Sequence, residues 1–299
     1  MSWIHVFELM CYLIVAVMLI DLVRKKDYNS LFTFGSAALV GFVMELLAVA
    51  VTDIYYYNPD FYLNLGFEPK QFPVFGGFMW GGLTVYGIKL AQKLRWGKWG
   101  TALAAGMFIV TMDILLDVVA IRLDGGFWVW VGKEISLRID QHTFMSVIWV
   151  NFLGYMIETP TVVLLTLRKR ERVAEHDWKR QTAQMFMIAL EAIGVTAAGS
   201  LIALGMNALI NDWFACVAFA VLWAVMAVLM VYRGMKLRLK PENLKKWNWP
   251  MLIFWAAMYG YCLAALCSLE IHTAAPWFLV LGIVFTAATL YISTAEEAR

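Results

Sequence analysis

The chain has 299 residues, of which 62% are hydrophobic and 15% charged, with a formal net charge of +2 and a mean hydropathy of +0.69. This apolar share lies well above that of ordinary soluble domains and argues against a soluble protein. The small net charge, with basic residues confined to short connections, argues against a nucleic-acid partner. We therefore expect an all-α, polytopic membrane helix bundle in contact with membrane lipid.

Apolar runs of about 20 residues, the length that a helix needs to cross ~30 Å of hydrocarbon, occur along the whole chain. The first run is followed by the basic residues 24–26 and has no small-residue cleavage site, so it is predicted to be a span and not a removable signal peptide. The runs predict about nine transmembrane helices, at residues 3–23, 31–53, 72–93, 100–121, 146–168, 182–209, 213–234, 250–270 and 275–294.

Basic residues are concentrated in every second connection, namely at residues 24–26, 93–98, 168–172 and 236–246. Because cytoplasmic loops carry the excess of Lys and Arg, the N-terminus is predicted to face out and the C-terminus in. The charged segment after the fifth span suggests two parts. Residues 1–168 would form a five-span catalytic bundle with two aromatic outer loops, and residues 169–299 a four-span bundle packed against it.

The two long outer connections, YYYNPDFYLNLGFEPKQFP and LDGGFWVWVGKEISLRIDQHTF, are rich in aromatic residues. Aromatic rings with a polar tip commonly form a belt at the headgroup layer of the membrane. A lid over a cavity that opens to the outer leaflet is the alternative. The Gly125-Gly126 pair and the length of both connections favour the lid.

Two carboxylates, Asp113 and Asp117, lie in the fourth apolar run with a spacing that puts them on one helix face. A rise of ~1.5 Å per residue places them roughly 20 and 25 Å from the inner end of the run, and Glu45 roughly 21 Å along the second run. Asn151 falls near the outer end of the fifth run and Glu158 near its middle. An ionised carboxylate costs about 2.5 kcal/mol or more at mid-membrane, so the protonated acid, a proton donor, is the cheaper state. The sequence therefore predicts acid–base chemistry on a lipid-soluble molecule.

No metal or cofactor site is predicted. The chain lacks a Gly-rich phosphate loop, a Gly-x-Ser-x-Gly elbow and an Asp-Asp-x-x-Asp box for Mg-diphosphate. The histidines are scattered over separate segments, without the paired spacing that membrane di-iron enzymes require (His5, His142, His176 and His272). The cysteines lie in apolar runs without Cys-x-x-Cys spacing, which indicates small core residues (Cys11, Cys216, Cys262 and Cys267).

Five short motifs follow one another between Glu45 and Glu158: ELLAVAVTDIYYY, FPVFGGFMW, DILLD, FWVW and NFLGY. This pattern resembles that of the membrane carotenoid hydratases of the bisanhydrobacterioruberin hydratase type, which add water to the terminal double bonds of acyclic carotenoids. The resemblance covers about a third of the chain. Three departures bear on the substrate more than on the chemistry: Val118 stands where the family has Pro, Tyr155 replaces a Trp, and residues 133–142 are long and highly charged.

The resemblance implies a cofactor-independent hydro-lyase of a prokaryotic plasma membrane that acts on a lipophilic isoprenoid or carotenoid. A protonated Asp113 or Asp117 would donate to the alkene, and a water held by Glu45 and Asn151 would attack the cation, with Glu45 as general base. Aromatic faces would stabilise the cation by cation–π attraction, worth about 2 kcal/mol when desolvated. The expected substrate-binding residues are Tyr57, Trp80, Trp128, Trp130, Tyr155 and Glu158.

Two alternatives remain open. An isoprenoid cyclase would use the same carboxylates and rings, with an internal alkene in place of water. A proton-coupled transporter or a lipid-binding membrane protein would also bury carboxylates, but transporters usually have an internal repeat and discontinuous helices, which the sequence does not show. A retinal Schiff base is disfavoured, because Lys89 is the only lysine well inside a predicted span and lies near its inner end.

Overall fold

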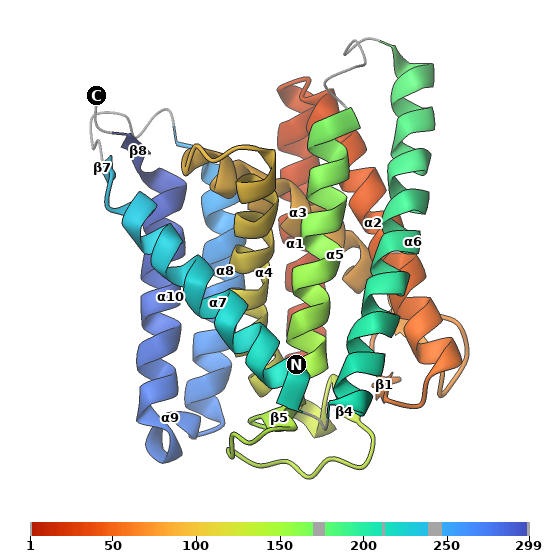
Figure 1. Ribbon diagram of the computed structural model, residues 1–299, viewed down its shortest axis with the longest axis vertical. Coiled ribbons are helices and arrows are strands. Elements are labelled where there is room, and N and C mark those ends of the chain that lie inside the picture. The colour runs from red at the N-terminus through yellow and green to blue at the C-terminus, as the bar shows by residue number, and fades with distance from the viewer. Residues whose placement is uncertain (1, 170–176, 211–212, 239–246, 298–299) are drawn as a thin grey trace.

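Nine long helices dominate the computed structural model, which describes residues 2–169, 177–210, 213–238 and 247–297 (Figure 1). Each helix begins and ends within four residues of a predicted apolar run, so the predicted all-α bundle is confirmed. The helices are α1 (Trp3–Arg24), α2 (Tyr28–Val51), α3 (Val74–Lys93), α4 (Lys98–Ala120), α5 (Trp149–Lys169), α6 (Trp178–Leu209), α7 (Trp213–Gly234), α8 (Trp249–Ser268) and α10 (Pro276–Thr294).

Eight of these helices in the described part of the chain are long and apolar enough to cross a membrane. The ninth, α3, has the required length, but its many glycines and polar side chains lower its hydropathy. Its position explains this composition, because α1, α2 and α4 pack against α3 and most of its residues are buried. The protein is a multi-pass integral membrane protein.

Helices α3 and α4 form the centre of the bundle. On one side α2, α5 and α6 pack together, and on the other side α8 packs against α1, α4 and α10. Helix α7 is strongly inclined and crosses α4 and α5 (Figure 1). The helices of residues 169–299 thus contact both sides of the first five spans. The connection at residues 170–176, where the chain was predicted to divide, lies outside the described residues.

The two chain termini lie at opposite ends of the bundle (Figure 1). Near the start of α1, the Ile4 N–H donates to the Asp124 carboxylate in the connection after α4, at 2.8 Å. At the other end, strands β7 (Leu237–Arg238) and β8 (Glu296–Glu297) pair. Parts of the basic connections, residues 170–172 and 239–246, lie outside the described residues, and which end faces the cytoplasm stays a prediction.

Short strands, which the apolar pattern of the sequence does not predict, organise the connections at the end of the bundle where α1 begins. Two glycines with positive φ, Gly125 at +83° and Gly126 at +100°, turn the chain from α4 into β4. The first of them ends a helical turn, η1 (Leu123–Gly125), and a short helix α9 (Ile271–Ala274) joins α8 to α10. The antiparallel pairs are β1 (Tyr55–Tyr57) with β4 (Trp128–Trp130), β2 (Asn64–Leu65) with β3 (Phe72–Pro73), and β5 (Thr143–Phe144) with β6 (Val147–Ile148).

The connection between β4 and α5 is fixed by an arginine. The Arg122 guanidinium donates to the backbone carbonyl oxygens of Val118, Ser136 and Met145. Partial burial lowers the pKa of Arg122 to about 10. Because three carbonyl groups accept from it, this side chain holds the long connection over the end of α4.

A buried carboxylate fixes the connection between α2 and α3. Glu8 of α1 is fully buried and accepts hydrogen bonds from the backbone N–H groups of Tyr62, at 2.6 Å, and Leu63, at 3.1 Å. Each carboxylate oxygen accepts from one of the two N–H groups, whereas a glutamine side chain has an acceptor oxygen at only one of these positions. Glu8 therefore ties this connection to the bundle.

We expect Glu8→Gln to destabilise the protein by about 2 kcal/mol, the usual contribution of a hydrogen bond to a charged group, and to lower Tm by about 4–8 °C. The amide nitrogen would face one of the two backbone donors and could not accept from it. Thermal unfolding of the detergent-solubilised protein measures the change. Glu68→Gln, on an exposed side chain of the same connection, is the matched control and should leave Tm unchanged. An equal Tm for the two variants would show that Glu8 does not anchor the connection.

Candidate functional site

A cavity of about 80 Å³ lies among α2, α3, α4 and α5, beneath the β1–β4 strand pair. Phe7 from α1 and Met258 from α8 also line it. Its lining includes nine of the ten predicted site residues, which are Glu45, Tyr57, Trp80, Asp113, Asp117, Trp128, Trp130, Asn151 and Tyr155. The depths predicted from the sequence thus agree with the spatial grouping of these side chains.

The β1–β4 pair forms the cover of the cavity. Tyr55 pairs with Trp130 and Tyr57 with Trp128, and all four side chains line the cavity. Since side chains alternate along a strand, the residue between the two tyrosines, Tyr56, points away and is exposed. The cover therefore presents four aromatic rings to the carboxylates below it.

Glu45 of α2 lies under this cover as a hydrogen-bond acceptor. The hydroxyls of Tyr55 and Tyr57 both donate to its Oε2 atom, at 2.6 and 2.8 Å. A side-chain hydrogen bond from Trp80 also reaches this carboxyl. Three donors from two segments, β1 and α3, therefore orient Glu45 toward the cavity.

Asp113 and Asp117, one turn apart on α4, face the cavity from the opposite wall. Each is only 2% exposed. A side-chain hydrogen bond joins the two carboxyls, and a second joins Asp113 to Tyr155. The amide nitrogen of Asn151 donates to Asp117 Oδ2 at 2.6 Å. Asn151 therefore lies beside the aspartates, which differs from the expectation that it holds a water together with Glu45.

Trp80 and Tyr155 form the wall between the two groups of carboxyls. Their rings stack with centroids 5.0 Å apart and an interplanar angle of 27°. The backbone of α2 approaches the indole so closely that a Cβ atom on Gly41 would lie 2.4 Å from Trp80 Cδ1. Only glycine fits at position 41 with the indole in this place.

Glu158 is the one predicted site residue that does not line the cavity. It lies on α5 one turn beyond Tyr155, is 9% exposed, and its Oε1 atom has no hydrogen-bond partner within the described part of the chain. Glu45 is close enough to interact with it electrostatically. The expectation that Glu158 contacts the substrate therefore has no support from its position.

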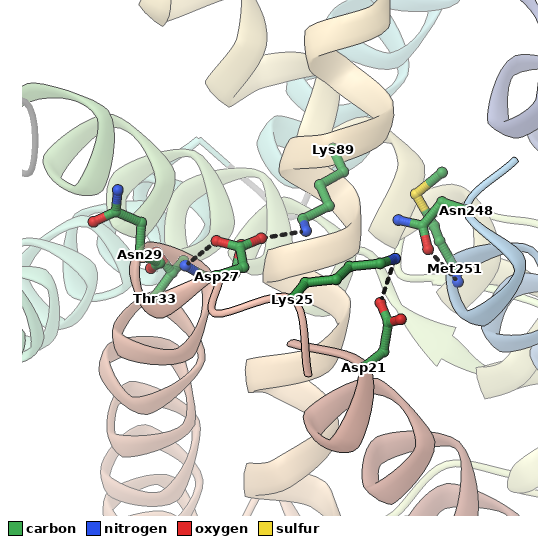
Figure 2. Close-up of polar contacts among 9 residues, drawn as sticks. Asp21, Lys25, Asp27, Asn29, Thr33, Lys89, Asn248 and Met251 are labelled. Atoms are coloured by element: carbon green, nitrogen blue, oxygen red, sulfur yellow. Dashed lines mark hydrogen bonds and ion pairs between the residues drawn. The ribbon is translucent and has the colours of Figure 1, made fainter. Parts of the chain in front are cut away.

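Figure 2 shows a second polar cluster, at the opposite end of α3, where the turn between α1 and α2 meets it. Lys89 forms an ion pair with Asp27 at 2.7 Å, and Lys25 forms one with Asp21 at 2.8 Å. Asp27 also caps α2 by accepting from the Ser30 N–H at 3.1 Å. Lys89 therefore has a structural role in this ion pair and does not line the carboxylate cavity.

No group of three or more His, Cys, Asp or Glu residues that could hold a metal ion occurs among the residues with described positions. One of the four histidines, His176, lies outside them. In comparisons with protein families, curated proteins and solved structures, nothing matches this chain. The function must therefore be argued from the site itself.

Tyr55 and Met258 line the cavity but were not among the site residues predicted from the sequence. Tyr55 donates the shorter of the two tyrosine bonds to Glu45, and its position two residues before Tyr57 in a Tyr-rich strand was the available signal. Met258 reaches the cavity from α8, and no sequence pattern indicates it.

Proposed function

We propose that the protein is a cofactor-independent membrane hydratase that adds water to a terminal C=C bond of a lipophilic isoprenoid polyene, of the carotenoid class. One observation carries this proposal: carboxyls with opposite hydrogen-bonding roles face a single aromatic-lined cavity. A hydrogen bond between Asp113 and Asp117 needs a proton on one of them. Glu45 Oε2, which receives two phenol donors, is an acceptor. The cavity therefore offers both an acid and a base.

The reaction balances without any other reagent. The aspartate pair gives its proton to the less substituted alkene carbon, so a C–H bond forms as the π bond breaks and a tertiary carbocation remains. Water attacks this carbon, the C–O bond forms, and the released proton passes to Glu45. Return of that proton across the cavity to the aspartate pair restores the starting state. Proton transfers by positioned groups of this kind typically contribute 10²–10⁴-fold to the rate.

The walls of the cavity suit a carbocation. Trp80, Trp128 and Trp130 line it, and a cation close to an aromatic face gains about 2 kcal/mol where water is excluded. The aromatic rings around the cavity thus support a role in stabilising the carbocation.

The cavity volume limits what can enter. About 80 Å³ is room for a few waters, each of which takes up ~30 Å³ in the liquid, whereas sites that bury a whole drug-sized ligand measure about 300–1,000 Å³. A complete polyene is far too large for this space, so only the end of such a chain can approach the carboxyls. This supports reaction at a terminal double bond.

The resemblance of residues 45–158 to the membrane carotenoid hydratases supports the polyene as substrate class and a prokaryotic plasma membrane as the location. The motifs behind that resemblance supply Glu45, Tyr57, Asp113, Asp117 and Asn151, all of which line the cavity. Cyclisation is the nearest alternative reaction, because an internal alkene could take the place of the water.

Expression in a host that makes acyclic polyenes tests the proposal. We expect extracted pigments to gain the mass of one water per reacted end, as measured by mass spectrometry, and a variant with both Asp113→Asn and Asp117→Asn to produce none. Unchanged mass with altered retention would identify a cyclase instead. Unchanged mass and retention, with the protein present in the membrane, would contradict both reactions and favour transport or lipid binding.

A further inference from the structure

We infer that Asp113 is the proton donor of the aspartate pair and that Asp117 is its ionised positioning partner. This inference rests on the proposed function and assigns within it the two roles that the pair leaves open. The two residues differ in their surroundings, although both lie on one face of α4 and are equally buried.

Asp117 is surrounded by groups that only donate. The amide nitrogen of Asn151 donates to its Oδ2 atom at 2.6 Å. A side-chain hydrogen bond from Trp128 also reaches it, and an indole N–H has no acceptor capacity. Two obligate donors on one carboxyl favour the charged form, because an ionised carboxylate only accepts.

Asp113 has no such obligate donors, because its two hydrogen-bond partners, the Tyr155 hydroxyl and the Asp117 carboxyl, can both accept. Its Oδ2 atom is buried and has no partner among the residues that the structure describes. An ionised Asp113 would leave this oxygen uncompensated, at a cost of about 1–3 kcal/mol or more for a charged group. A protonated Asp113 donates to Asp117 through the hydrogen bond that joins the two carboxyls, and leaves only a neutral carbonyl oxygen without a partner. Since Asp113 lines the cavity, it is placed to pass this proton to a substrate carbon.

The neighbouring carboxylate also serves the step that follows. When Asp113 gives up its proton, the cation formed in the cavity lies beside two carboxylates, and their charge stabilises it more than a single one would. Asn151 and Trp128 keep Asp117 in place while this happens. Asp113 thus acts on the substrate, and Asp117 acts through Asp113.

Infrared spectroscopy of the purified protein tests the assignment without any substrate. A protonated carboxyl has a C=O stretching band that shifts in D₂O. We expect Asp113→Asn to lose one such band and Asp117→Asn to keep it. Asp53→Asn, on an exposed loop carboxylate, is the matched control and should leave the band unchanged. Loss of the band in Asp117→Asn, in both variants or in neither would overturn the assignment.

Turnover gives the second readout. With polyene supplied in D₂O, we expect Asp113→Asn to lose deuterium incorporation at the alkene by at least about a hundredfold, and Asp117→Asn to retain measurable incorporation. Asp113→Glu keeps an acid at this position, so it should recover part of the deuterium exchange and show a shifted C=O band. This recovery would show that the loss in Asp113→Asn is not caused by misfolding. The two readouts separate the two claims. If the variants show the expected infrared bands but the wild-type protein hydrates no polyene, the proposed function is refuted and the protonation assignment stands.

Discussion

Glu45→Gln is expected to abolish hydration while leaving alkene protonation intact. The amide keeps an oxygen for the Tyr55 and Tyr57 hydroxyls, so the shape of the site is preserved, but it cannot take a proton from water. We expect the rate of hydrated product to fall by at least about a hundredfold. The cation should instead lose a proton from a neighbouring carbon, so the substrate should still exchange hydrogen for deuterium in D₂O.

Mass spectrometry of the recovered polyene distinguishes the outcomes. Glu134→Gln, on an exposed side chain of the β4–α5 connection, is the control and should hydrate at the wild-type rate. Loss of deuterium exchange together with hydration would place Glu45 in the proton-donating group and reverse the proposed roles of Glu45 and the aspartate pair. Unchanged hydration would show that the water is held by other residues.

Gly41→Ala is expected to reduce turnover by about a hundredfold, the effect of moving a reacting group by ~1 Å. The new Cβ atom would lie 2.4 Å from Trp80 Cδ1, and the indole must move because it meets the α2 backbone. Tyr155 stacks on Trp80 and would move with it, together with its bond to Asp113. Overpacking of this kind costs about 1–3 kcal/mol, so the protein should still fold.

Gly154→Ala is the matched control for this substitution. A Cβ atom on Gly154 meets nothing within 4 Å, although this glycine directly precedes Tyr155 in α5. Alanine is preferred to glycine inside a helix by about 1 kcal/mol, so this variant should keep full turnover and gain slightly in stability. Conversion measured at equal amounts of inserted protein compares the two. Wild-type turnover in Gly41→Ala would show that the Trp80 wall does not position the reacting groups.

Much of the fold follows from the sequence, because hydrocarbon imposes a length and a composition on every spanning helix. Helix α3 shows the limit of that rule: its glycines lower its hydropathy, yet it is central because they let α2 approach closely. The depth of Glu45, Asp113 and Asp117 also followed from a fixed rise per residue. Depth, however, leaves the rotation of each helix open.

The unpredicted details of the site all depend on that rotation or on contacts between distant segments. Asn151 was placed at the correct depth, but its amide meets Asp117 and not Glu45. Glu158 belongs to the same face of α5 and still misses the cavity. Glu8 resembled an ordinary polar residue in the first span, since its two backbone partners, the Tyr62 and Leu63 N–H groups, lie in the connection between α2 and α3.

The strand pair over the cavity has a consequence for synthesis. Residues 55–57 leave the ribosome before α3 and α4, whereas their partners, residues 128–130, follow both helices. At about 5–20 residues per second, the interval between the two strands is roughly 4–14 s. During that time β1 presents unpaired N–H and C=O groups and three tyrosine rings at the membrane surface. Slower elongation lengthens this exposure, so the yield of correctly assembled protein should depend on translation speed between α3 and β4.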